Sequence, residues 1–310
     1  MQLNFRLLSV ITLASFTTFT ACKKDSSSTS TDPSVELTAH ADDQSEVSSQ
    51  IDAVVNNADA AVESSAAYTG KMQNPPVSIC DATVAYDSVS NPRTITITYN
   101  GNTCNGAYTR AGVVTISMAQ GTQWKNQGAT VTVAYQNLKI VRVADNKSIT
   151  INGSHTITNV SGGLLWNLAT LPSITHVINS DNMSITFSDN TQRTWHVARR
   201  RVFTLSNNQL VITVTGNYSD GTHDGIAEWG INRFGHAFTT TITQPLVIRQ
   251  DCNFRLTSGE VKHEGFATAT ATFGLDASGN PTSCPGTGHY YFKVAWTGPN
   301  GASANAILPY

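Results

Sequence analysis

From Val77 onward the chain alternates between apolar and polar positions. Ile95, Ile97 and Tyr99 are separated by single threonines, and the same two-residue period recurs almost to the C-terminus. Successive side chains of a β-strand point to opposite faces, so this period predicts strands with one buried face. The predicted strands lie at residues 94–100, 114–118, 131–135, 138–143, 148–152, 183–187, 193–197, 210–215, 238–242, 267–273 and 290–296.

The connections between these predicted strands are short and rich in turn residues. Asn-Gly, Asp-Gly and Ser-Gly pairs that begin at Asn100, Asn152, Asp220 and Ser278 favour tight turns. Most of the connections are too short for the helical crossover that parallel strands need. The sequence therefore predicts an all-β domain at residues 69–310, a largely antiparallel sandwich or half-open barrel.

A different period precedes the strands. Residues 43–68 carry apolar side chains at three- and four-residue steps, which predicts one amphipathic helix. Asp43, followed three residues later by Glu46, fits a capping box at the start of this helix. A helix docked on the β-domain is favoured over a partner-binding or coiled-coil segment, because alanine and serine dilute the apolar stripe. The stripe comprises Val47, Ile51, Val54, Val55, Ala58 and Val62.

The first residues form a predicted export signal. Arg6 precedes an apolar stretch from Leu7 to Phe19, which is too short to span a bilayer. The stretch ends in Phe19-Thr20-Ala21-Cys22, which resembles the lipobox of bacterial lipoproteins. The resemblance implies a signal peptide at residues 1–21, cleavage before Cys22, and acyl chains on that cysteine. A soluble secreted protein or a retained membrane helix is the alternative.

The residues that follow Cys22 predict a flexible tether and a signal for export. Lys23-Lys24-Asp25 is similar to the start of lipoproteins from Bacteroidota, in which a charged cluster at this place can direct export to the cell surface. Residues 26–34 are rich in Ser and Thr, so a flexible lipid-anchored tether is expected over residues 22–42. Several acyl chains hold a protein durably at a membrane. We therefore expect an outer-membrane protein that faces the periplasm or the cell surface.

The other four cysteines fall into two similar segments. Cys80 and Cys104 flank a strand with alternating threonines, as do Cys252 and Cys284, and another predicted strand follows each pair. We interpret the two segments as a degenerate internal repeat. An even number of cysteines in an exported chain predicts disulfides, with three possible pairings. The repeat favours Cys80–Cys104 and Cys252–Cys284; the alternative, a zinc site, lacks the paired ligand spacing that zinc sites use.

Composition narrows the classes of partner. Only 13% of the 310 residues are charged and the formal net charge is −2 at pH 7, whereas a nucleic-acid binder needs a basic surface. The hydrophobic content of 40% is sufficient for a core, and no apolar run recurs as the spans of a polytopic membrane protein would. The expected partners are the membrane, through the N-terminal lipid, and a glycan or an envelope protein.

A search for catalytic motifs finds no G-x-S-x-G elbow, P-loop or H-E-x-x-H sequence. No metal or other cofactor is expected. The densest polar stretch is the predicted loop at residues 217–236, whose acidic groups offer calcium ligands or a carboxylate pair for glycoside hydrolysis, although an ordinary polar loop needs neither. Its candidate ligand-binding residues are Asp220, Asp224, Glu228, Trp229 and Arg233.

Three consecutive arginines interrupt one predicted strand. Arg199, Arg200 and Arg201 cannot share one face, because side chains alternate along a strand. A grip on an anionic sugar or phosphate is compatible with them, but a solvated edge that discourages strand pairing is favoured. Trp296 shares a face with the other aromatic residues of 290–296 and is expected in the core.

The Thr-alternating strands, the late cysteines and the segment Gln244-Pro245-Leu246-Val247 resemble a group of uncharacterised lipoproteins from Bacteroidota over residues 80–296. This resemblance implies no activity. The sequence thus predicts a non-catalytic, lipid-anchored envelope protein that serves as a binding or structural module. The alternative is a glycan-binding or glycan-hydrolysing surface protein that uses residues 217–236.

Overall fold

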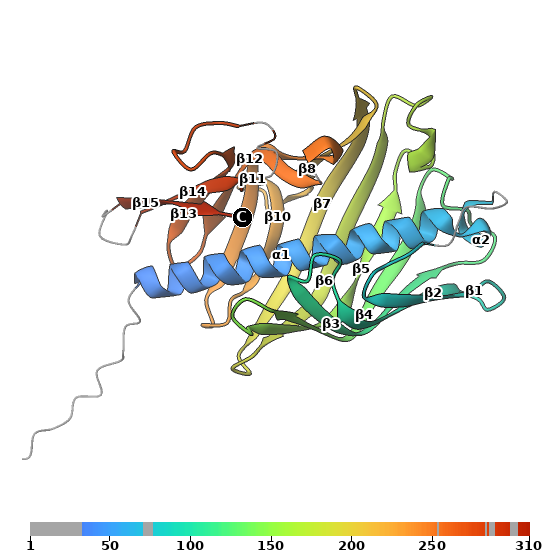
Figure 1. Cartoon of the computed structure of the whole chain (residues 1–310), viewed down its shortest axis with the longest axis horizontal. Coiled ribbons are helices and arrows are strands. Elements are labelled where there is room, and N and C mark those ends of the chain that lie inside the picture. Colours follow the sequence, from blue (N-terminus) through green and yellow to red (C-terminus); the bar gives the residue numbers. More distant parts are fainter. Residues whose placement is uncertain (1–32, 71–76, 253, 283, 285–288, 298–302) are drawn as a thin grey trace, which may run out of the picture. The chain divides into compact units, whose positions relative to one another are not determined.

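A computed structural model describes residues 33–70, 77–252, 254–282, 284, 289–297 and 303–310 (Figure 1). The predicted signal peptide, Cys22 and the first part of the predicted tether lie outside these described residues. Within the described part, no helix combines the length and the apolar character required to cross a membrane.

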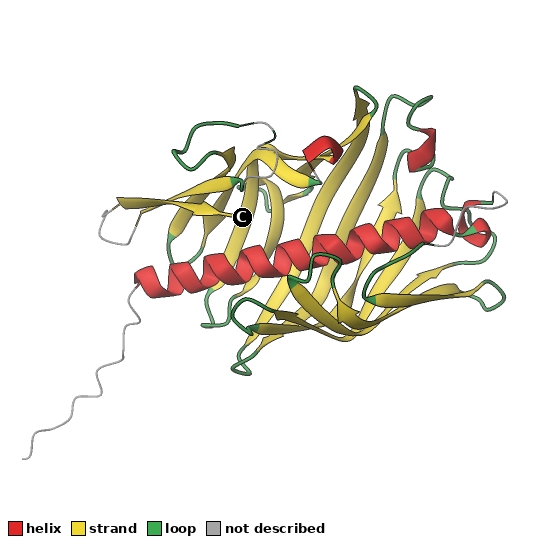
Figure 2. Cartoon of the chain, in the orientation of Figure 1, coloured by secondary structure: helices red, strands yellow, loops and turns green. Residues whose placement is uncertain are grey.

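The described residues form one long helix and a set of strands (Figure 2). Two short 3-10 turns, η1 (Leu165–Asn167) and η2 (Gln250–Cys252), interrupt the strand order. The remaining elements are α1 (Pro33–Ser64), α2 (Ala66–Thr69), β1 (Ala82–Asp87), β2 (Arg93–Asn102), β3 (Tyr108–Met118), β4 (Ala129–Arg142), β5 (Ser148–Asn159), β6 (Ile174–Phe187), β7 (Gln192–Ser206), β8 (Gln209–Gly216), β9 (Tyr218–Ser219), β10 (Asp224–Ile231), β11 (Ala237–Arg249), β12 (Arg255–Glu264), β13 (Thr268–Leu275), β14 (Tyr291–Thr297) and β15 (Ser303–Pro309).

All the strands belong to one antiparallel sheet. Its order follows the sequence from β1 to β7, continues through β10 and β11, and then runs to β15. The long strands β7 and β11 are bridged by β10 over one part of their length and each pairs with β8 over another. The prediction of a largely antiparallel all-β fold is confirmed. Of the two architectures left open, the sandwich is wrong, because the described strands form a single sheet rather than two.

The helix α1 lies against one face of this sheet and crosses its strands (Figure 1). All six residues of the predicted apolar stripe are buried, which confirms the docked amphipathic helix. The helix starts at Pro33, earlier than the predicted boundary at residue 43, so part of the predicted tether is helical. Proline is well suited to a first helical turn, and Glu36 in that turn suits the positive end of the helix dipole. Asp43 and Glu46 are therefore inside the helix, and the predicted capping box is wrong.

The core of the sheet is formed by the alternate residues of each strand that face inward. Ile97 of β2 pairs with Val114 of β3, and both are fully buried. The strands predicted at 131–135 and 138–143 are one strand, β4, with a bulge at Asn137 between them. Gly112 lies opposite this bulge with φ +132°, and a Cβ at this position would lie only 2.5 Å from the Asn137 carbonyl oxygen, so a side chain there has no room.

Candidate functional site

The interface between α1 and the sheet is unusually rich in charge. α1 carries seven carboxylates and no lysine or arginine. The face of the sheet that it covers supplies the complementary cations, which come from β4, β7 and the β10–β11 turn. The carboxylates are Glu36, Asp42, Asp43, Glu46, Asp52, Asp59 and Glu63, and the arginines are Arg142, Arg193, Arg199, Arg201 and Arg233.

Glu228 of β10 stands at the centre of this interface. Its side chain is 2% exposed. Arg199 of β7 donates to one carboxylate oxygen, and the Trp195 indole N–H donates to the other at 2.9 Å. From α1, Ser48 Oγ donates at 2.9 Å and the Gln44 amide donates as well. A carboxylate with this many donors stabilises the docking of α1 and has no lone pair directed to solvent.

Arg233 fastens the N-terminal part of α1. It lies in the β10–β11 turn and binds both oxygens of Asp43, and its Nη1 is 3.3 Å from Asp189 Oδ2 in the β6–β7 turn. Its guanidinium also lies over the ring of Phe187, 4.2 Å from the centroid. Burial raises the pKa of Asp43 above its ordinary range, and the hydrogen bond from Arg233 opposes that shift. Arg233 is therefore committed to an internal ion pair.

The C-terminal half of α1 pairs with β6 and β7. Asp59 Oδ2 accepts from Arg201 at 3.2 Å, and its other oxygen is 3.7 Å from His176 Nδ1. Burial raises the pKa of Asp59 to about 6, against the attraction of Arg201. Burial also lowers the pKa of His155 and of His176 to about 3, with neighbouring arginines acting in the same direction. The polar groups of this region are thus a neutral or paired interior rather than an open reactive site.

The outer face of the sheet carries a different arrangement. Trp229 follows Glu228 in β10 and points to the opposite face. The Tyr218 ring stacks on its indole with centroids 4.5 Å apart, and the His196 ring stacks on it at 5.4 Å. The strand register places His196, Trp229, Thr239 and Glu264 in one row across β7, β10, β11 and β12. Tyr218 is 43% exposed. We call this row, together with Tyr218, the aromatic row. Of the surfaces that carry predicted site residues, it is the one best suited to bind a ligand.

Asp220 and Asp224 lie beside the aromatic row without completing a binding site. One oxygen of Asp220 accepts the backbone N–H groups of Thr222 and His223, and these bonds lower the pKa of Asp220 to about 2. The other oxygen faces the His223 ring at 3.2 Å, so Asp220 serves to close the turn. Asp224 is exposed at the start of β10.

The five candidate residues therefore do not converge. Glu228 and Arg233 face α1, Trp229 faces outward, Asp220 lies in the turn that precedes β10, and Asp224 is the exposed first residue of β10. The predicted loop at 217–236 is also wrong in its middle, which is strand β10. A bulge between Ile226 and Glu228 interrupts the two-residue period there, and this hides the strand from a search for alternation.

Comparison of the chain with models of protein families, with curated proteins and with solved structures finds no match.

The arginine triplet is placed differently from the prediction of a solvated edge. β7 lies inside the sheet and pairs with β6, β8 and β10. Arg199 and Arg201 are buried against α1, and only Arg200 is exposed. The edge interpretation is wrong because the carboxylates that pair with these arginines belong to a helix more than 140 residues earlier in the chain.

The structure joins Cys80 to Cys104 and Cys252 to Cys284, which is the pairing that the repeat favours. In both segments a cysteine precedes two strands, its partner follows the second strand, and a third strand comes next. This order occurs in β1 to β3 and again in β12 to β14, near the two ends of the sheet.

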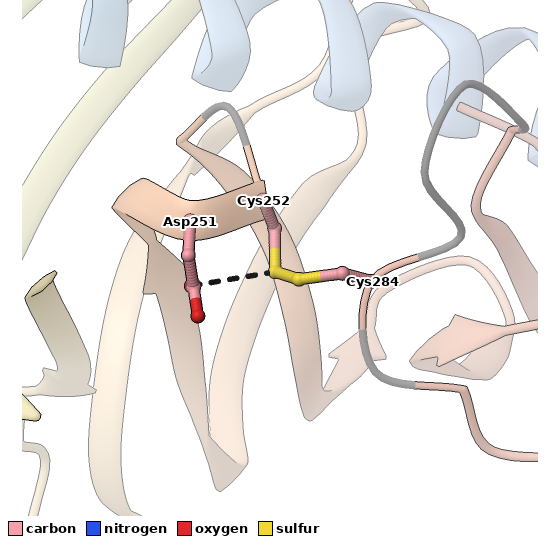
Figure 3. A group of neighbouring side chains, drawn as sticks. All are labelled: Asp251, Cys252 and Cys284. Carbon is pink, nitrogen blue, oxygen red and sulfur yellow. Dashed lines mark hydrogen bonds between the residues drawn. A yellow bond between two sulfur atoms is a disulfide. The ribbon is translucent and has the colours of Figure 1, made fainter. Parts of the chain in front are cut away.

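Asp251, Cys252 and Cys284 form the one group in the described part of the chain with the spacing of metal ligands (Figure 3). The two sulfurs are bonded to each other, so neither is a thiolate. Asp251 Oδ1 lies 3.6 Å from the Cys252 sulfur, and the carboxylate pairs with Arg249 at 2.6 Å. The chemistry of this group is that of a disulfide beside an ion pair.

Sequence reasoning missed Tyr218, His196 and Glu264, which accompany Trp229 on the outer face. These residues come from β9, β7 and β12. The strands β9 and β7 both pair with β10, and β12 is joined to β10 through β11. The seven carboxylates of α1 were a usable signal, since a helix of 32 residues without a lysine or arginine needs cations from elsewhere.

Trp296 is half-buried, on the same face of β14 as Phe292 and Val294. The prediction that Trp296 lies in the core is therefore only partly confirmed. The strands β14 and β15 are the last strands of the sheet and are less covered than the strands under α1.

Proposed function

We propose that this chain is a lipid-anchored, non-catalytic binding protein of a bacterial envelope. The observation that supports binding over catalysis is the placement of Glu228. In most enzyme families, glycoside hydrolysis needs two carboxyl groups that flank one substrate bond. Glu228, the only buried acid of the 217–236 segment, is enclosed by Arg199, Trp195 and α1, and no second carboxylate of that segment shares its face.

The anchor is supported by the lipobox-like sequence that ends at Cys22. The test is mass spectrometry of the mature N-terminus of the native protein, with a Cys22→Ala variant as the control. We expect an acylated N-terminal Cys22 in the native chain and an uncleaved, unacylated precursor in the variant. An unmodified thiol at Cys22 in membrane-derived protein would refute the anchor.

The outer aromatic row favours a glycan as the ligand. Sugar rings stack on aromatic faces through their C–H surfaces, while carboxylates and hydroxyls nearby bind sugar hydroxyls. Glu264 lies in the same row as Trp229, 3.7 Å from the His223 ring and 2.7 Å from Lys262 Nζ. Thr239, between Trp229 and Glu264 in the register, adds a hydroxyl. Together these groups supply the stacking and hydrogen bonding that a neutral saccharide requires.

A glycan array with the purified mature protein tests this assignment. We expect saturable binding that a Trp229→Ala variant loses and a Trp166→Ala variant keeps. Trp166 is a suitable control because it is also partly exposed, at 38%, but lies in η1, far along the chain from the row. Equal binding by both variants, or no binding by the native protein, removes the glycan assignment and leaves another envelope component as the ligand.

A further inference from the structure

Two neighbouring hairpin tips expose large apolar side chains at one end of the sheet. Phe234 lies in the β10–β11 turn and is 37% exposed, while Ile231 just before it is 41% exposed. Phe266 lies in the β12–β13 turn and is 41% exposed. The His236 and Phe266 rings stack with centroids 4.9 Å apart, so the two tips are in contact. We call Ile231, Phe234 and Phe266 the hairpin rim.

The N-terminal end of α1 meets the β10–β11 tip of this rim. Glu36, in the first turn of α1, is 3% exposed and accepts a hydrogen bond from the Asn232 amide at 2.9 Å. The same carboxylate oxygen lies 2.6 Å from His236 Nδ1. The chain that leads from Cys22 therefore joins the described unit beside the rim. Only ten residues separate Cys22 from Pro33, and such a segment spans at most about 40 Å even when fully extended.

The β10–β11 tip of the rim can leave water at low cost, because the polar groups of this turn already have partners. Asn232 Oδ1 accepts the backbone N–H groups of Phe234 at 3.0 Å and His236 at 2.9 Å, and the Gly235 N–H donates to the Asn232 carbonyl at 3.0 Å. A backbone N–H without a partner is what makes a loop costly to transfer into a membrane interface. The cation within this turn, Arg233, is neutralised by Asp43.

We propose that the hairpin rim inserts into the surface of the lipid bilayer that holds the acyl chains of Cys22. This inference rests on the proposed lipid anchor. The rim adds a second, apolar contact to that anchor, and this contact forms readily because the anchor keeps the rim at a high effective concentration beside the bilayer. The insertion fixes the end of the sheet that faces the lipid and turns the opposite ends of β11 and β12 away from it.

The test uses the full-length lipidated protein in vesicles of phosphatidylethanolamine and phosphatidylglycerol with brominated acyl chains, which quench tryptophan on contact. Phe234→Trp and Phe266→Trp place reporters on the rim. Phe254→Trp is the matched control, because Phe254 is 50% exposed but lies in the turn at the other end of β11 and β12. Each variant is compared with the unsubstituted protein, so that the native tryptophans cancel. We expect the added emission of the two rim reporters to be blue-shifted and quenched at least twofold, with the control unchanged.

Equal quenching at all three positions, or none at the two rim positions, overturns the inference. Mass spectrometry of the same samples separates this failure from that of the anchor. An acylated Cys22 without quenching at the rim refutes the rim alone, whereas an unmodified Cys22 refutes the anchor and the rim together. Far-ultraviolet circular dichroism identical to that of the unsubstituted protein verifies that each variant is folded.

Discussion

Glu228 holds α1 on the sheet, so its replacement by alanine is the most direct test of the buried charge network. Arg199, Trp195, Ser48 and Gln44 all donate to this one carboxylate. The substitution removes both oxygens of the carboxylate, so all four donors lose this acceptor at once and stay in the interface. The side chain of Arg199 is only 8% exposed and keeps Asp52 as its remaining carboxylate, at 2.8 Å.

The magnitude follows from the groups that lose their partners. Removing one member of a buried ion pair destabilises a protein by about 3–5 kcal/mol, chiefly because the other charge stays buried. The indole N–H of Trp195 adds an unsatisfied buried donor, which costs about 1–3 kcal/mol by itself. The two effects overlap, so we expect Glu228→Ala to lower the free energy of unfolding by about 4 kcal/mol. Glu228→Gln keeps one acceptor for the indole and should lose about half as much.

Urea unfolding at pH 7, followed by circular dichroism, measures these differences. Asp224→Ala is the control, because Asp224 lies on the same strand but is exposed, and its loss should change the stability by less than about 0.5 kcal/mol. Hydrogen exchange adds a local measurement, in which α1 amides should exchange faster in Glu228→Ala. The reasoning is refuted if Glu228→Ala is no less stable than Asp224→Ala, or if α1 keeps its full protection.

Three further predictions concern pH and the disulfides. Burial lowers the pKa of His155 to about 3, so below its ordinary value of 6.5 the unfolded chain takes up a proton that the folded chain does not, and stability is lost as the pH falls. His155→Phe removes this loss, and its stability relative to the native chain should rise by about 2 kcal/mol between pH 7 and pH 5 in denaturation curves. Burial raises the pKa of Glu63 from 4.5 to about 7, so that stability is present at low pH and lost as the pH rises through 7. Glu63→Gln should therefore lose less stability than the native chain between pH 5 and pH 8, and an unchanged pH slope would contradict this. Cys80→Ser with Cys104→Ser opens a loop closed over 24 positions, which should cost about 3 kcal/mol in urea unfolding, and a loss below 1 kcal/mol would contradict the constraint.

Local periodicity explains which parts of the fold were predictable. The alternation around Ile95 and Ile97 and the stripe from Val47 to Val62 each reflect one element with one buried face, and both are observed. A period of this kind depends only on neighbouring residues. The architecture depends on strand pairing over long distances, so the sequence left a sandwich and a half-open barrel equally open.

The candidate site was less predictable for the same reason. Asp43 and Arg233 read separately as a helix cap and a ligand-binding cation, yet they form one ion pair across 190 positions. The arginines of β7 likewise read as a solvated edge until the carboxylates of α1 are placed opposite them. A charged residue in a sequence does not reveal whether its partner is solvent, a ligand or another part of the same chain.

The positions of the charges along α1 fix the register in which the helix docks on the sheet. Its apolar stripe, from Val47 to Val62, is made of small and similar side chains, and a stripe of this kind packs almost as well after a shift of one turn, about 5.4 Å. The charges do not tolerate that shift, because Asp43 and Asp52 would move away from Arg233 and Arg199, and no other carboxylate of α1 lies four residues from either. The pairs that fix the register are Asp43 with Arg233, Glu46 with Arg142, Asp52 with Arg199 and Asp59 with Arg201. They are spread over more than four turns of the helix, so a partner protein that displaced α1 would have to supply four carboxylates at the same spacing. This makes α1 an integral part of the β-domain rather than a partner-binding segment.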